Sequence, residues 1–243
     1  MKEKRIEIDK LDQPFPIWFI LFVPIYCAVA FSLLIFLPAG DWTWLEGWIS
    51  VLSLALTIGS GTAIVNQQNP RVLRNRSRLK KQGLTKATEK PAASDRFIMP
   101  LMGIGGFGAL VLSALGHRFG WYSLPFGVAV IGAVVMNLGA VLMLVAQNQN
   151  AHASKILDIN KGQVLVDTGL YGLIRHPLYA GYCILILFFP LALGSLWGLP
   201  LAILSCASIV IRIHFEEEML LKGMAGYEDY QLRVKYKLIP GVY

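Results

Sequence analysis

Long apolar runs alternate with short polar stretches along most of the chain, and this alternation predicts membrane-spanning helices. A helix needs about 20 mainly apolar residues to cross the hydrocarbon core of a bilayer. The first four runs have about that length, at residues 15–37, 45–65, 97–115 and 124–146. We therefore expect each of them to form one transmembrane helix.

The last apolar stretch, residues 178–211, predicts two helices instead of one. At about 34 residues it is too long for a single span and short for two. Pro190 and the pair Gly194 and Ser195 offer a break near its middle, so we expect a tight helical hairpin. The predicted fold class is therefore an all-α integral membrane protein with about six transmembrane helices.

Composition and the placement of charge agree with this topology. Hydrophobic residues make up 55% of the chain and charged residues 15%, against roughly 25% charged in an average soluble domain. The net charge of +7 gathers between the spans, which fits the cytoplasmic excess of Lys and Arg and not a nucleic-acid-binding module. The first long loop holds Arg71, Arg74, Arg76, Arg78, Lys80, Lys81, Lys86, Lys90 and Arg96. We expect both termini and both long loops to be cytoplasmic.

Glycines inside the predicted spans indicate close helix packing. Residues 103–108 match the dinucleotide-binding pattern GxGxxG, but that pattern functions between a strand and a helix N-terminus. Here it lies within an apolar run, so close contact with a neighbouring helix is the better interpretation. Gly59 and Gly61 of the second span are interpreted in the same way.

The sequence has no pattern typical of a metal site or a disulfide framework. Cys27, Cys183 and Cys206 all lie in apolar runs, where a cysteine usually serves as a small buried hydrophobe. The four histidines have none of the spacings that bind zinc. We therefore expect no metal.

A polar string, residues 147–155, follows the fourth span directly. Asparagine and glutamine side chains at this depth are costly unless they form hydrogen bonds. The string therefore predicts either the start of a polar pocket or a set of side chains that cap the helix end.

Charged residues gather at the two ends of the predicted hairpin. Pro177 suits the first turn of a helix, which places Arg175 and His176 at a helix N-terminus, where free N–H groups favour an anion. Arg212 and Glu216 follow the second apolar half with i,i+4 spacing. A snorkelling arginine with a helix-end ion pair would explain this spacing, and so would a binding site, since charges at a membrane rim are usually functional. A short hairpin would bring both clusters together on the cytoplasmic rim, which implies a pocket there.

An ordered set of motifs occupies residues 147–243, about 40% of the chain. The motifs are 162–181, which contains Arg175-His176-Pro177, followed by 190–195, Arg212-xxx-Glu216, 226–230 and 238–241. This set resembles the isoprenylcysteine carboxyl methyltransferase family, relatives of the phospholipid methyltransferases. On that basis we divide the chain into an N-terminal helical pair with its basic loop, 1–96, and a methyltransferase core, 97–243.

The resemblance implies S-adenosylmethionine as the cofactor and a lipophilic methyl acceptor that enters from the bilayer. The catalytic residues it implies are Arg212, which would position the acceptor, Glu216 and His176. The cofactor contacts it implies are Gln163, Val164, Leu165, Val166, Tyr171, His176, Pro177, Tyr179, Glu216 and Glu217. Methyl transfer from a sulfonium is an in-line displacement, so positioning supplies much of the rate. The carboxylate of an isoprenylcysteine-like or other lipid would need no base, whereas an amine or hydroxyl would need one, with His176 or Glu216 as candidates.

Two other functions fit the same sequence. A membrane sterol-type reductase, whose C-terminal core is distantly similar, would use NADPH. A non-catalytic membrane scaffold would bind neither cofactor and would hold a stable partner. The cofactor that raises thermal stability in detergent distinguishes these possibilities.

Overall fold

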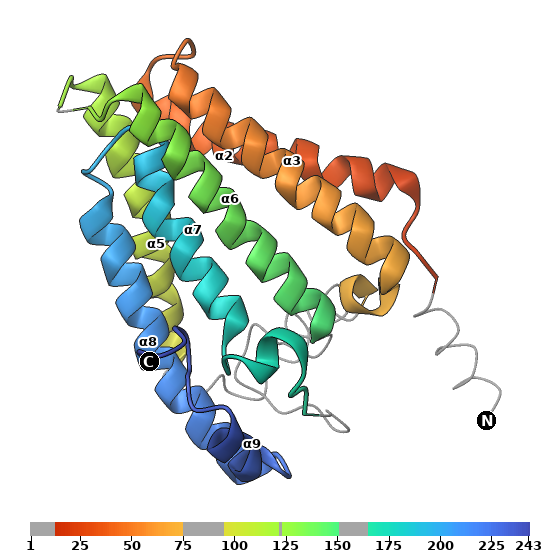
Figure 1. Ribbon diagram of the computed structural model, residues 1–243. Helices are drawn as coiled ribbons and strands as arrows, with labels where there is room; N and C mark the ends of the chain where they lie inside the picture. Colours follow the sequence, from red (N-terminus) through yellow and green to blue (C-terminus); the bar gives the residue numbers. More distant parts are fainter. Residues whose placement is uncertain (1–12, 75–94, 122, 151–164) are drawn as a thin grey trace.

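The computed structural model describes residues 13–74, 95–121, 123–150 and 165–243, and these ranges are built from helices (Figure 1). They contain no strand, although Ser123 and Ser195 form one isolated bridge. In chain order the elements are α2 (Ile17–Ala39), α3 (Leu45–Gln68), α5 (Asp95–Arg118), α6 (Phe126–Gln149), the 3-10 helix η1 (Gly169–Gly172), α7 (Pro177–Ala192), α8 (Leu199–Gly223) and α9 (Tyr227–Arg233).

Five of these helices, α2, α3, α5, α6 and α8, are long and apolar enough to cross a membrane. The helix α7, which forms the first half of the predicted hairpin, is apolar but has only 16 residues, or about 24 Å at 1.5 Å per residue. The prediction of an all-α, multi-pass membrane protein is therefore confirmed. About six spans were expected. The described ranges contain five helices of spanning length and one shorter apolar helix, α7.

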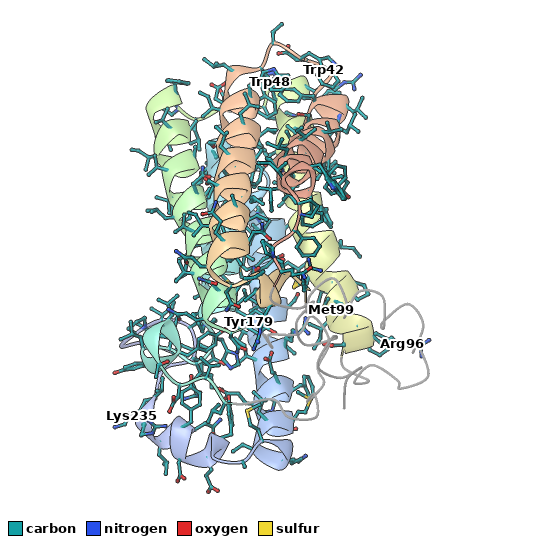
Figure 2. The ribbon with its side chains drawn as sticks, turned by 90° about the vertical axis from the view of Figure 1, so that its right-hand side faces the viewer. Trp42, Trp48, Arg96, Met99, Tyr179 and Lys235 are labelled. Atoms are coloured by element: carbon teal, nitrogen blue, oxygen red, sulfur yellow. The ribbon has the colours of Figure 1, made fainter. Side chains whose placement is uncertain are left out.

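Successive helices run in opposite directions, so their ends gather at two ends of the bundle (Figure 1). We call one the site end, where α5 and α7 begin and α8 ends. The other is the far end, which holds residues 40–44 and 193–198. In Figure 2, Trp42 and Trp48 mark the far end, whereas Met99 and Tyr179 lie toward the site end. Tryptophans are enriched at membrane–water interfaces, which suits the far end.

A buried apolar core joins five helices of the bundle. It includes Ile35 and Phe36 of α2, Leu54 of α3, Met136 of α6 and Phe189 of α7, together with residues of α5. The helix α2 leaves most of its apolar side chains at least partly exposed, as expected for a helix that faces lipid. This core draws on residues from both sides of the predicted boundary between 1–96 and 97–243, and that domain division stays a prediction.

Two glycines of α3 allow neighbouring helices to approach, as predicted. A Cβ atom at Gly59 would lie 2.7 Å from the Cβ of Pro24 in α2. A Cβ atom at Gly61 would collide with Leu144 of α6. Because α3 uses small residues on both of these faces, it packs closely between α2 and α6.

The GxGxxG run in α5 also serves helix packing. A Cβ atom at Gly105 would lie 2.8 Å from both the carbonyl oxygen of Leu201 and the backbone nitrogen of Ser205 in α8. In contrast, a Cβ atom at Gly103 would meet nothing within 4 Å. Gly105, and not Gly103, therefore allows α5 and α8 to approach closely.

The helix α8 extends farther than the hydropathy pattern predicts. The predicted apolar segment ends at 211, and only the i,i+4 spacing of Arg212 and Glu216 indicated a helix beyond it, whereas α8 runs without a break from Leu199 to Gly223. Its last turns are polar and hold contacts to α5, α7 and the C-terminal residues, and these tertiary contacts stabilise the extra length. The hairpin turn includes Gly194 at φ 66° and Ser195, which were among the breaks that the sequence offered, whereas α7 continues through Pro190.

Candidate active site

The residues that precede α7 are bonded to a short segment near the C-terminus. The backbone N–H groups of Arg175 and His176 donate to carbonyl oxygens of residues 236 and 237, both at 2.9 Å. The Arg175 guanidinium donates to two further carbonyls, of residues 234 and 235, at 2.6 and 2.9 Å. We call residues 234–237 the C-terminal clamp, because they fix the start of α7.

A buried carboxylate links this clamp to α8. Glu217 Oε1 lies 2.7 Å from Arg175 Nε and 3.2 Å from His176 Nε2, and its Oε2 lies 3.0 Å from Lys237 Nζ. Glu217 and both of its Oε1 partners are buried. A buried carboxylate is stabilised only when it is paired and hydrogen-bonded, and here both oxygens are engaged. Glu217, predicted as a cofactor contact, is therefore placed where it joins α8, the start of α7 and the clamp.

Glu216, the neighbouring acid, faces a different group. Tyr179 of α7 donates its hydroxyl hydrogen to Glu216 Oε2 at 2.5 Å. The Tyr179 ring stacks on that of His176, with centroids 5.6 Å apart and an interplanar angle of 11°. Both Glu216 and Tyr179 remain partly exposed. Three residues predicted to contact the cofactor thus lie together, with the carboxylate of Glu216 beside the aromatic pair.

Arg212 lies one helical turn before Glu216 and is 3% exposed. Its NH2 group lies 3.4 Å from Asp95 Oδ2 at the start of α5, and its guanidinium also contacts the sulfur of Met99. Its Cζ lies 5.9 Å from the centroid of the Tyr179 ring. The sequence predicted Arg212 and Glu216 as a pair on one face, and the structure binds each of them to a different neighbouring helix.

Tyr171, predicted as a wall of the cofactor site, is buried in η1. Its carbonyl oxygen accepts a hydrogen bond of 2.7 Å from the Tyr230 hydroxyl of α9, and its own hydroxyl lies 3.5 Å from the Ala146 carbonyl oxygen. Burial raises the pKa of Tyr230 above the ordinary range of a tyrosine, so the phenol keeps its donor proton. Tyr171 is therefore anchored from both α6 and α9.

The polar string 147–155 begins inside α6, and its Gln149 side chain contacts η1. The Gln149 side-chain oxygen accepts a hydrogen bond of 2.9 Å from the backbone N–H of Leu170. This contact ties the end of α6 to η1, but it does not cap the free carbonyl oxygens at the end of α6, because Gln149 is the acceptor. Residues 151–155 of the string lie outside the described ranges.

The predicted cofactor stretch 163–166 is only partly described. Gln163 and Val164 lie outside the described residues. Leu165 packs against Tyr227 and Tyr230 of α9, and Val166 is half-buried. Pro177 occupies the first turn of α7, as predicted, and is buried.

Two residues that form ion pairs at the candidate site were not predicted from the sequence. Asp95 had been assigned to the first long loop, but it opens α5 and pairs with Arg212. Lys237 lies between two of the motifs and was not singled out by the sequence, but it completes the ion cluster around Glu217. An acidic residue at the edge of an apolar run is the one sequence signal that marks Asp95. For Lys237 there is no local signal, because its partner is distant in the chain.

A metal-binding arrangement is not formed by the described residues. A search of those ranges found no group of three or more His, Cys, Asp or Glu side chains that could hold an ion. The three cysteines are free thiols. The groups that lie together at the site end are Arg212, Glu216 and the aromatic pair of His176 and Tyr179, with the ion cluster of Arg175, Glu217 and Lys237 beside them.

Comparison with known proteins agrees with the resemblance found in the sequence. Residues 128–226 match a family model described as phospholipid methyltransferase, a range that contains Arg175, Arg212 and Glu216. This match supports a membrane methyltransferase. A search among curated proteins found no match. A solved structure described as the eukaryotic intramembrane Ras methyltransferase ICMT (isoprenylcysteine carboxyl methyltransferase) is similar, with a TM-score of 0.49, 21% identity, and coverage of 94% of this chain and 87% of that chain.

Proposed function

We propose that this chain is an S-adenosylmethionine-dependent membrane methyltransferase that acts on a lipophilic acceptor, and that the acceptor group is a carboxylate, as in an isoprenylcysteine-like or other lipid acid. The observation that carries the proposal is the meeting of Arg212, Glu216 and Tyr179 at the site end. A cationic fork, a carboxylate and an aromatic ring are the groups that such a reaction needs in one place.

The residues present fit the proposed cofactor. When bound, S-adenosylmethionine supplies a methyl group on a positively charged sulfur. The partly exposed Glu216 carboxylate suits a cation or ribose hydroxyls, and the stacked rings of His176 and Tyr179 suit a flat base or a cation. Gln163 to Val166 and Tyr171 are proposed as the wall of the same site.

Arg212 is proposed to orient the acceptor. A guanidinium always carries its charge and presents a planar fork that matches a carboxylate. An ionised carboxylate attacks without losing a proton, so the residue that aims it contributes through positioning and electrostatics.

His176 supports a carboxylate over an amine or hydroxyl acceptor. Its Nε2 lies 3.2 Å from Glu217 Oε1, which orients the ring and commits one of its two nitrogens to the buried ion cluster. An acceptor that needs a base would therefore depend on the other ring nitrogen or on Glu216, which Tyr179 already binds. An ionised carboxylate acceptor needs no base, so it depends on neither group.

The topology gives each substrate its own route. We propose that the site end and both termini are cytoplasmic, and the positive-inside bias of the first long loop supports this orientation. The cofactor would enter from the cytoplasm. The lipophilic acceptor would enter sideways from the bilayer, which surrounds the exposed apolar faces of the helices.

Incubating membranes that contain the protein with methyl-labelled S-adenosylmethionine tests the proposal directly. We expect label in a lipid or lipidated product, in a base-labile form typical of a methyl ester. Arg212→Ala and His176→Ala should each abolish the label. Arg118→Ala at the far end and His214→Ala, an exposed residue of α8, are the matched controls and should keep it.

The same preparation separates the alternatives. Near-wild-type labelling by both Arg212→Ala and His176→Ala would contradict the site assignment. Thermal stabilisation in detergent by NADPH and not by S-adenosylmethionine would indicate a reductase. Binding of neither, with a stable partner on purification, would indicate a scaffold.

A further inference from the structure

Asp95 lies where it can control the direction of the Arg212 side chain. Its Oδ2 is 3.4 Å from Arg212 NH2, and the two residues are 5% and 3% exposed. We propose that Asp95 is a positioning residue that holds the Arg212 guanidinium in the orientation that receives the acceptor carboxylate. This inference rests on the proposed function.

Helix packing brings Asp95 opposite Arg212. The helices α5 and α8 run antiparallel, and the Ser205 hydroxyl of α8 donates to the Met102 carbonyl oxygen of α5 at 3.0 Å. Farther along, Gly105 lies close against the backbone of α8. These contacts fix the register of the two helices over several turns, so the position of Asp95 relative to Arg212 is set by rigid elements.

The guanidinium is held between two helices. Asp95 approaches it from α5, and the Tyr179 ring of α7 lies 5.9 Å from its Cζ. A buried cation needs a compensating charge to remain in place. Because the guanidinium has five N–H donors in a rigid plane, contact with Asp95 on one edge sets the direction in which the other donors point.

Asp95 also competes with Glu216 for the same cation. Glu216 follows Arg212 by one helical turn, the spacing at which oppositely charged side chains pair within a helix. Glu216 is instead hydrogen-bonded to Tyr179. Loss of the Asp95 charge would favour re-pairing of Arg212 with Glu216, which would turn the arginine away from the acceptor and take the carboxylate from the cofactor side.

Substitution at Asp95 tests the proposal, with methyl transfer as one readout and unfolding temperature in detergent as another. We expect Asp95→Asn to lower kcat/KM for the labelled acceptor by about 10- to 100-fold, the size expected when a reacting group is misplaced. Asp95→Glu should restore part of the loss, because it returns the charge. Asp167→Asn is the matched control, since Asp167 pairs with Arg233 on the surface at 2.6 Å, and its activity should stay within about twofold of wild type.

Dependence on Arg212 distinguishes positioning from a general structural effect. In an Arg212→Lys background, Asp95→Asn should lower the residual activity much less than it does in the wild type, because the two changes disturb one interaction. Equal losses in both backgrounds, or an Asp95→Asn enzyme as active as Asp167→Asn, would overturn the proposal and leave the methyltransferase function standing.

The pair can be tested even if no methyl transfer is found. In that outcome the proposed function fails, and the coupling of Asp95 with Arg212 is measured through unfolding temperature in detergent. We expect the double variant Asp95→Asn with Arg212→Gln to be less destabilised than the two single variants together. Strict additivity would show that the two residues do not interact.

Discussion

Arg175 and Glu217 form a buried ion pair, with Nε and Oε1 2.7 Å apart and both side chains less than a tenth exposed. This pair connects the start of α7 to the last turns of α8. The same arginine holds the C-terminal clamp through backbone carbonyls. The candidate site is therefore framed by a structural pair that is separate from the pair proposed for chemistry, Arg212 and Glu216.

Glu217→Gln should destabilise the protein strongly, because it leaves Arg175 and Lys237 near a neutral side chain in a buried place. Removing one member of a buried ion pair typically costs about 3–5 kcal/mol. Thermal unfolding in detergent measures the loss. The neighbouring Glu218 is half exposed, so Glu218→Gln should change stability by less than about 1 kcal/mol. Equal effects of the two substitutions would contradict the structural role of Glu217.

Tyr179→Phe should weaken methyl transfer while preserving the fold. It keeps the ring that stacks on His176 and removes the hydrogen bond to Glu216. Hydrogen bonds to charged groups are worth about 1.5–3 kcal/mol, so we expect roughly a 10- to 100-fold loss of S-adenosylmethionine affinity or of kcat/KM. Tyr182→Phe is the control, because Tyr182 bonds Ser205 deeper in the bundle. If Tyr182→Phe lowered activity as much, the effect would not be specific to the site.

Gly105→Ala should destabilise the contact between α5 and α8. Its Cβ would lie 2.8 Å from backbone atoms of α8, which cannot move aside as a flexible side chain can. Overpacking of this kind costs about 1–3 kcal/mol. Gly103→Ala faces open space and should be neutral or stabilising by up to about 1 kcal/mol, since alanine favours a helix. The unfolding temperatures of the two variants give the comparison, and the opposite order would contradict the packing interpretation of GxGxxG.

Stability should fall at alkaline pH through Tyr230. Burial raises the folded-state pKa of this phenol above its usual value of about 10. Its contribution is therefore complete below the unfolded pKa and is lost as pH rises toward the folded pKa. Tyr230→Phe removes the hydrogen bond to Tyr171 but should flatten the decline in unfolding temperature above pH of about 10. An unchanged slope in that variant would assign the decline to other groups.

Hydropathy was sufficient to locate the first four helices, because membrane-spanning segments are specified by a local property of about 20 residues. It failed for the second half of α8. There charged and apolar residues alternate after 211, and the helix is stabilised because Arg212, Glu216 and Glu217 contact other elements. Such contacts join residues far apart in the sequence, so no local pattern reports them.

The candidate site could be predicted as a set of residues but not as an arrangement. The i,i+4 spacing placed Arg212 and Glu216 on one helix face, and the motif identified His176 and Tyr179. Glu217 joins the buried ion cluster and Glu216 binds Tyr179 because they face different sides of α8. The sequence has three consecutive glutamates at 216–218, so it does not show which of them faces which side. The role of Asp95 depends on the packing of α5 against α8.

The C-terminal clamp also has a consequence for biosynthesis. Residues 234–237 follow every predicted span, yet they bind the backbone of Arg175 and His176 at the start of α7. While the chain is being inserted into the membrane, α7 would therefore be in place before the ribosome releases the residues that fix its first turn. The candidate site would mature only after insertion. Premature termination before 234 would therefore leave a membrane-embedded protein whose helices are assembled and whose candidate site is not.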